Sequence, residues 1–242
     1  MYICPMAKFF CAIQPYDSSE FLEQEFDTNN ISITNFNSET APNLYSNSEY
    51  SNQRYYNAPT KVSKSEVALS NTLRMLWEQH VEWTRMSIIS IIFGLPDEDF
   101  VIKRLLRNPK DFEAVLKPLY GDKIAAKLSE LFTNHLVIAA QLVKSAKSGN
   151  MKAVSDIRKK WYANADEIAV FLSNINPYWV LEDWKSMLYK HLSLTESEAV
   201  NILKANYEKG IDIYDEIEKQ ALGMADVMTE GIVKQFPQHF AK

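Results

Sequence analysis

Hydrophobic side chains recur every three or four residues from residue 63 almost to the C-terminus, which is the period of an amphipathic α-helix. The first such stretch follows Ser63-Lys64-Ser65-Glu66, a capping-box sequence in which the serine accepts a hydrogen bond from a free backbone amide. It ends at Gly94 and Pro96, two residues that stop helices. The pattern therefore predicts a long first helix with Leu73, Trp77, Val81, Ile88 and Ile91 on its buried face.

Seven further helices are predicted from the same period and from start and stop signals. Their starts are marked by Asn108-Pro109, Asn150, Asn176-Pro177 and a second capping box, Thr195-Glu196-Ser197-Glu198. The last two helices, 195–210 and 211–236, can also be interpreted as one kinked helix, because Gly210 lies within the apolar pattern. The predicted ranges are 97–107, 109–120, 122–148, 151–174, 177–191, 195–210 and 211–236.

The order and length of these segments predict an all-α fold. Glycines 94, 121, 149 and 210 each fall at a predicted helix end, where a left-handed residue often caps the helix. No period-two alternation typical of strands appears after the N-terminal segment. Long helices joined by short turns favour an antiparallel bundle of four to five long helices with short accessory helices, over residues 63–242.

Residues 1–62 differ in kind from the rest of the chain. Asn, Ser, Tyr and Thr dominate them, and no apolar face runs through them. Such a segment cannot bury enough apolar surface to offset chain entropy, so we predict a disordered tail. Its tyrosines leave docking to a protein partner, or self-association, open.

Composition narrows the class of protein further. The chain has a formal net charge of −5 and short basic runs interleaved with acids, which argues against nucleic acid as a partner. No apolar run reaches the roughly 18 residues of a membrane span. Cys4 and Cys11 lie in the tail without metal-ligand or disulfide spacing. We expect a cytoplasmic protein.

Polar residues near the middle of two predicted helices form a candidate ligand site. Stepping three and four residues along the first helix places His80 and Thr84 on its core face, with Arg85 on a flank where an acid of a neighbouring helix can pair with it. His135 lies at the centre of the apolar face of 122–148. Asn164 and Asp166, in Trp161-Tyr162-Ala163-Asn164-Ala165-Asp166-Glu167, complete the candidate ligand-binding set, with Asp215 and Asp226 as further acids.

The alternative is that both histidines are core residues bonded to neighbours. The sequence contains no Glu-x-x-His pair of the di-iron class, and neither His-x-x-x-His nor His-Glu-x-x-His. A metal ion therefore remains a possible cofactor, but no sequence motif indicates one. Gly-x-Ser-x-Gly and glycine-rich phosphate loops are absent as well. We therefore predict no catalytic residue.

Four stretches carry a resemblance to known proteins: 76–85, 103–112, 161–169 and 217–226. Through them residues 66–236 resemble a group of helical proteins from spore-forming Firmicutes. Members of the group carry names such as acetylglutamate kinase or glycosyltransferase. Both activities imply α/β folds with nucleotide loops, which these residues do not support. The resemblance supplies no site residues.

Two functional hypotheses follow. The first is a helical bundle that binds a small ligand or metal ion in a polar pocket of its core. The alternative is a structural or protein-interaction protein, with a link to sporulation, that uses its tail and a face of the bundle.

Overall fold

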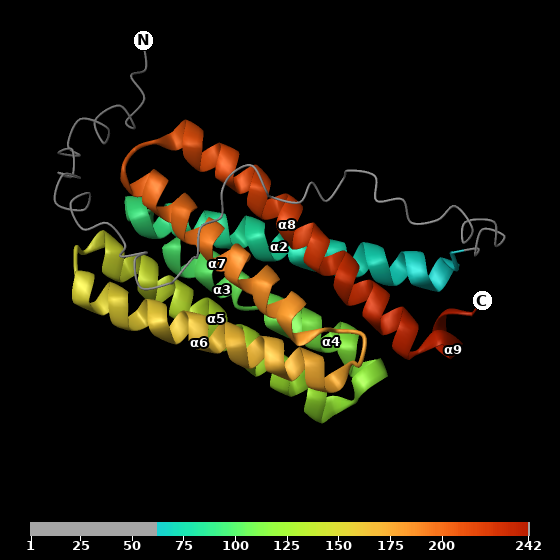
Figure 1. Cartoon of the computed structure of the whole chain (residues 1–242). Coiled ribbons are helices and arrows are strands. Elements are labelled where there is room, and N and C mark those ends of the chain that lie inside the picture. The colour runs from blue at the N-terminus through green and yellow to red at the C-terminus, as the bar shows by residue number, and fades with distance from the viewer. Residues whose placement is uncertain (1–61, 242) are drawn as a thin grey trace, which may run out of the picture. The chain divides into compact units, whose positions relative to one another are not determined.

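A computed structural model of the chain describes residues 62–241, and the predicted tail therefore lies almost wholly outside the described residues. The described part is an all-α bundle without strands (Figure 1), which confirms the predicted fold class. Five of its helices are long and three are short. The helices are α2 (Lys64–Phe93), α3 (Glu98–Leu105), α4 (Asn108–Tyr120), α5 (Asp122–Lys147), α6 (Met151–Ile175), α7 (Leu181–Leu203), α8 (Tyr207–Gln235) and α9 (Pro237–Phe240).

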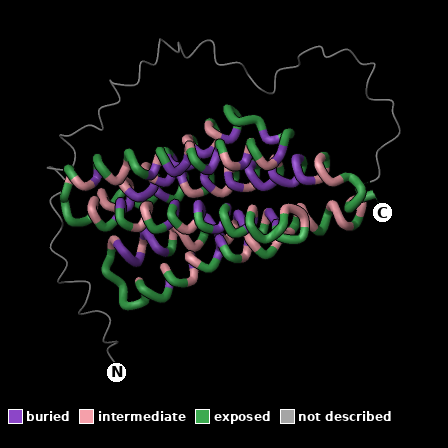
Figure 2. Tube along the Cα trace, turned by 90° about the horizontal axis from the view of Figure 1, so that it is seen from below, coloured by how far each residue is buried: buried purple, intermediate pink, exposed green. Residues whose placement is uncertain are grey.

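The helices form a closed ring. Following the contacts, α2 packs on α8, α8 on α7, α7 on α6, α6 on α5, α5 on α4, and α4 back on α2. Figure 1 shows α2 and α8 side by side, and α5 beside α6. Along each helix the buried positions face the interior (Figure 2), as the three-to-four-residue period predicts.

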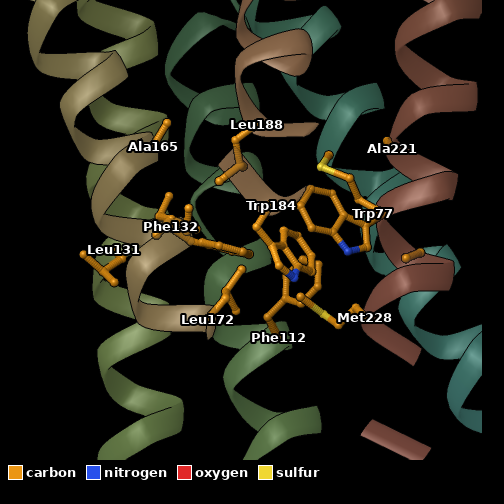
Figure 3. Packing of buried hydrophobic residues seen from close by; sticks show 14 of the residues in the cluster. Trp77, Phe112, Leu131, Phe132, Ala165, Leu172, Trp184, Leu188, Ala221 and Met228 are labelled. Atoms are coloured by element: carbon orange, nitrogen blue, oxygen red, sulfur yellow. The ribbon is translucent and has the colours of Figure 1, made fainter. Parts of the chain in front are cut away.

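Large aromatic and aliphatic side chains fill the centre (Figure 3). Trp77, Phe112 and Phe132 contact one another edge to face, with ring centres 5.3–6.0 Å apart. Trp184 is fully buried in the same cluster. These rings bring α2, α4, α5 and α7 to one core, because each helix supplies one of them.

Several predicted helix ends are confirmed by their caps. The hydroxyl of Ser63 accepts from the amide of Glu66, and Oδ1 of Asn150 accepts from the amide of Ala153. Gly94, Gly121 and Gly149 have φ between 62° and 81°, a conformation that favours glycine. Local signals therefore place these ends correctly.

The predicted boundaries near residues 195 and 210 are wrong. Helix α7 runs without a break through Thr195, whose hydroxyl donates to the carbonyl of His191 one turn earlier rather than capping a new helix. It ends at Leu203, and Ala205 takes the left-handed conformation at φ 56°. Gly210 lies in the first turn of α8. The Asn176-Pro177 start is also wrong, because α7 begins at Leu181.

Candidate functional site

Three histidines lie in the core, each on a different long helix. His80 lies on α2, His135 on α5 and His191 on α7, with 3–5% of each residue exposed. His135 follows His80 by 55 residues, and His191 follows His135 by 56. The core therefore contains a repeated feature of the chain, and only two of its three members were predicted.

Each of these histidines is held by an amide side chain from a helix that packs against its own: α4 for α2, α6 for α5 and α8 for α7. Nδ1 of His80 lies 3.2 Å from Oδ1 of Asn108, and Nδ2 of Asn108 donates to the carbonyl of Leu76, one turn before His80. His135 repeats this with Asn164 (2.8 Å) and the carbonyl of Leu131, and His191 with Gln220 (3.1 Å) and the carbonyl of Met187.

The repeated geometry fixes the tautomer of each ring. A backbone carbonyl only accepts hydrogen bonds, so the amide –NH₂ must face it and the amide oxygen must face the ring. That oxygen is also only an acceptor, so Nδ1 of the histidine carries the proton and donates it. A neutral ring protonated at Nδ1 has a bare lone pair at Nε2, on the opposite edge.

Burial keeps all three rings neutral. Loss of hydration lowers the pKa of His80 to about 4, although its bond to Asn108 acts in the opposite direction. Burial, together with repulsion from the neighbouring rings, lowers the pKa of His135 and of His191 to about 3. The three side chains are therefore electron-pair donors at neutral pH.

The three rings line one small cavity of about 10 Å³. Its other wall residues are apolar, namely Trp77, Phe132, Ile168 and Leu188. Trp77, Phe132 and Leu188 each lie three residues before a cavity histidine, so the repeat extends to the wall. The three bonded amides are not part of the wall, and the Nδ1 edges of the rings therefore point away from the cavity. The volume is about what one water molecule needs.

The ring positions fall short of a formed metal centre. The centres of His80 and His191 are 5.6 Å apart, with the ring planes at 45°. Within residues 62–241, no group of three or more His, Cys, Asp or Glu side chains lies at metal-binding spacing.

Three of the six predicted site residues, His80, His135 and Asn164, meet at this core. Asn108 was predicted as a helix cap, but its side chain instead joins His80 to the carbonyl of Leu76, since α4 begins at Asn108 itself. The other three predicted residues lie elsewhere. The hydroxyl of Thr84 donates to the carbonyl of His80, a bond within one helix that leaves the ring untouched.

Arg85 forms an ion pair with Glu198 of α7, the acid on a neighbouring helix that the flank position predicted. Its guanidinium also lies 4.9 Å from the ring centre of Tyr214. Burial raises the pKa of Glu198 to about 7, although Arg85 lowers it. This pair links α2, α7 and α8 and is separate from the cavity wall.

Asp166 lies on the outside of the bundle, where it pairs with Lys185 and accepts a hydrogen bond from Tyr189. Of the other acids considered, Asp226 pairs with Arg74 at 2.6 Å and Asp215 is exposed. The acids therefore do not join the core histidines.

Comparisons with known proteins add no assignment: no family model, curated protein or solved structure matches the chain. In the part of the chain that is described, no helix is long and apolar enough to cross a membrane.

Acid is expected to destabilise the protein through these rings. Between pH 6.5 and about 4 the unfolded chain takes up protons on its histidines while the folded rings stay neutral, so each ring lowers the free energy of unfolding by about 1.4 kcal/mol per pH unit. Glu78 and Glu198, whose pKa values burial raises to about 7, act in the opposite direction because they take up protons when folded.

The measurement is urea unfolding of the native chain and of His191→Gln at pH 7, 6 and 5. The two carboxyl groups contribute equally to both proteins and cancel in the difference. The native chain should lose more stability with falling pH than the variant. Equal slopes would contradict a neutral His191.

Proposed function

We propose that this protein binds a single small cation in its three-histidine core. The observation that supports the proposal is the cavity of about 10 Å³ bordered by three neutral imidazoles, each with Nδ1 protonated and Nε2 bare. Three bare nitrogens are electron-pair donors. They favour an electron-pair acceptor, which means a metal ion or a hydrogen-bond donor such as ammonium, over an anion.

The hydrogen-bond pattern also supports a bound ligand. Within residues 62–241 the hydrogen bonds of the three rings involve Nδ1, so each Nε2 keeps an electron pair for a ligand.

The test is thermal unfolding of the chelator-treated full chain with Zn²⁺, Ni²⁺ or ammonium added singly. At least one of them should raise Tm, since a ligand at 100 times its Kd adds about 2.7 kcal/mol to stability. The rise should disappear in His135→Gln and remain in His239→Gln, a matched change at the one histidine outside the core. No rise with any probe, or an equal rise in both variants, rules the proposal out.

A further inference from the structure

Apolar side chains reach the surface along the seam between the end of α2 and the start of α8. On α2 they stand at positions 86, 89 and 93, and on α8 at 207, 211 and 214, so each set lies on one side of its helix. Phe93, Tyr207 and Ile211 are 42–54% exposed. The seam patch, as we call this surface, consists of Met86, Ile89, Phe93, Tyr207, Ile211 and Tyr214.

Contacts across the seam bring the two sets together. The ring centres of Phe93 and Tyr207 are 6.2 Å apart, and the guanidinium of Arg85 lies 4.9 Å from the ring centre of Tyr214. The two helices therefore run antiparallel, and the two isoleucines of the patch lie between these contacts. The patch is one continuous apolar surface, and such a surface marks a place where another molecule packs.

Three carboxyl groups adjoin the seam patch, those of Glu78 and Glu82 on α2 and of Glu218 on α8. Burial raises the pKa of Tyr214 to about 12, and repulsion from these three carboxyl groups contributes, so they lie close to its hydroxyl. Within residues 62–241 none of the three forms an ion pair, because the nearby arginines of α2 pair with other acids. The apolar part of the seam therefore continues into an acidic part.

Two of these carboxyl groups are hydrogen-bonded to each other across the seam. Burial, followed by this bond and by repulsion from Glu218, raises the pKa of Glu78 to about 7. Glu82 adds to the rise, and Arg74 opposes it. A hydrogen bond between two carboxyl groups needs a proton on one of them. A cation placed beside the pair relieves the repulsion and favours the fully ionised form.

The two parts of the surface select the chemistry of a partner. The apolar part fits apolar side chains, and the acidic part fits lysine or arginine. A helix has the shape to lie along a seam between two helices, because its rows of side chains fit between theirs. From position 207 to position 218 the seam runs about 16 Å, which three turns of a helix span.

We propose that the seam patch and its three acids bind a basic amphipathic helix of a partner protein. The helix places apolar side chains on the patch and lysine or arginine side chains beside the carboxyl groups. A second copy of this chain fits less well, because it brings the same acids to the interface. Nucleic acid and anionic lipid surfaces are repelled by the same charges. The proposal goes beyond the cation site and is independent of it.

The experiment is a titration of labelled model peptides of about 18 residues with the full chain, followed by fluorescence anisotropy. One peptide has leucine at helical spacing and lysine elsewhere, and a second has glutamate in place of lysine. One lysine peptide should bind per chain, and the glutamate peptide should not bind. A scrambled lysine peptide without an apolar face should bind at least about tenfold more weakly. Binding of the glutamate peptide, equal binding of the scrambled peptide, or no binding at all overturns the proposal.

Exposed positions allow this surface to be changed without altering the core. Ile211→Ser should weaken binding of the lysine peptide by about tenfold, because it removes a central apolar side chain. Glu82→Gln should weaken it by about threefold, the size of an exposed ion pair. Val170→Ser and Glu167→Gln, matched changes at exposed positions of α6, should leave the affinity unchanged. Equal affinities of the seam variants and their controls contradict the proposal.

The carboxyl pair gives the binding a pH dependence. The lysines of the peptide stay charged between pH 6 and pH 8, whereas the pair loses its proton over this range. The affinity should therefore rise by about tenfold from pH 6 to pH 8. The rise should vanish in Glu78→Gln, which retains Glu198 of α7, whose pKa burial also raises to about 7. A pH-independent affinity of the native chain, or a rise that persists in Glu78→Gln, overturns the proposal.

Sedimentation of the chain without peptide tests the competing occupant. Ile211→Ser should leave the oligomeric state of the chain unchanged. A change from dimer to monomer in this variant would assign the seam patch to a second copy and would end the proposal of a basic partner helix.

Discussion

Arg85→Met is expected to lower the free energy of unfolding by about 3–5 kcal/mol at pH 8, which is a large part of the roughly 5–15 kcal/mol that stabilises a domain of this kind. The reason is the carboxylate that remains. Glu198 is 1% exposed, and without Arg85 its charge is buried and unpaired. Arg85 also donates to the carbonyl of Gly210 at 3.4 Å, so its removal loosens the start of α8.

The loss of stability caused by Arg85→Met should become smaller as pH falls. Burial raises the pKa of Glu198 to about 7 in the native protein, and the loss of Arg85 removes the one group that lowers it. In Arg85→Met the pKa of this carboxyl group therefore lies above its native value, so the group takes up a proton and loses its charge as pH falls through and below neutrality. Denaturant unfolding at pH 8 and at pH 5.5 should show the variant closer to the native protein at the lower pH.

Two companion variants separate the charge from the packing. Glu198→Gln leaves Arg85, whose side chain is 21% exposed and reaches water, so its cost should be smaller. Replacing both residues by apolar ones, in Arg85→Met with Glu198→Met, should restore much of the stability. If the double variant is as unstable as Arg85→Met, the unpaired carboxylate is not the cause.

Gly231→Ala is expected to lower the free energy of unfolding by about 3 kcal/mol or more. Overpacking a core typically costs about 1–3 kcal/mol, and this change should lie at or above the upper end of that range. A Cβ at this position of α8 would lie 2.0 Å from Nε1 of Trp179 and 2.4 Å from Cδ1. The indole has no room to retreat, because it is 1% exposed and contacts Tyr120 and Trp184. Its Nε1 also donates to the carbonyl of Val227.

Gly223→Ala is the matched control for this change. Gly223 lies in the same helix and is exposed, and a Cβ there meets nothing within 4 Å. Alanine is a better helix former than glycine, so this variant should gain about 0.5–1 kcal/mol. Denaturant unfolding of both variants tests the pair. Equal effects at the two positions would show that the contact with Trp179 does not govern Gly231.

Much of the fold could be predicted from the sequence because helix formation and burial share one period. The apolar spacing placed Leu73, Trp77 and Val81 inside, and all three are buried. Boundaries failed where tertiary contacts override local signals. Thr195 and Glu198 look like a cap, but one bonds within its helix and the other pairs with Arg85. The true end of α7 has no glycine, because Ala205 takes the left-handed conformation.

Only part of the candidate site could be predicted from the sequence, for a related reason. His80 and His135 stand at mid-helix and are easy to recognise, whereas His191 appeared at a predicted helix end that does not exist. The missing signal is the repeat: amides at 108, 164 and 220 are each 56 residues apart, alongside the three histidines. Internal repeats of this kind are the sequence signal that points to such a core. The resemblance to the Firmicutes group remains a prediction.

The closed ring of helices has a consequence for the order in which the protein folds. Most contacts join neighbours along the chain, such as α5 with α6 and α7 with α8, and such local contacts form fast. The contact between α2 and α8 is different, because it joins the two ends of the described chain. Forming it costs the entropy of closing the long loop made by all the helices between them. His80 lies on α2, whereas His135 and His191 lie on α5 and α7, so the three rings line one cavity only after α2 has packed on these later helices. A partly unfolded chain in which α2 has not yet packed therefore lacks the shared cavity, and the cation proposed above would bind only the fully assembled bundle.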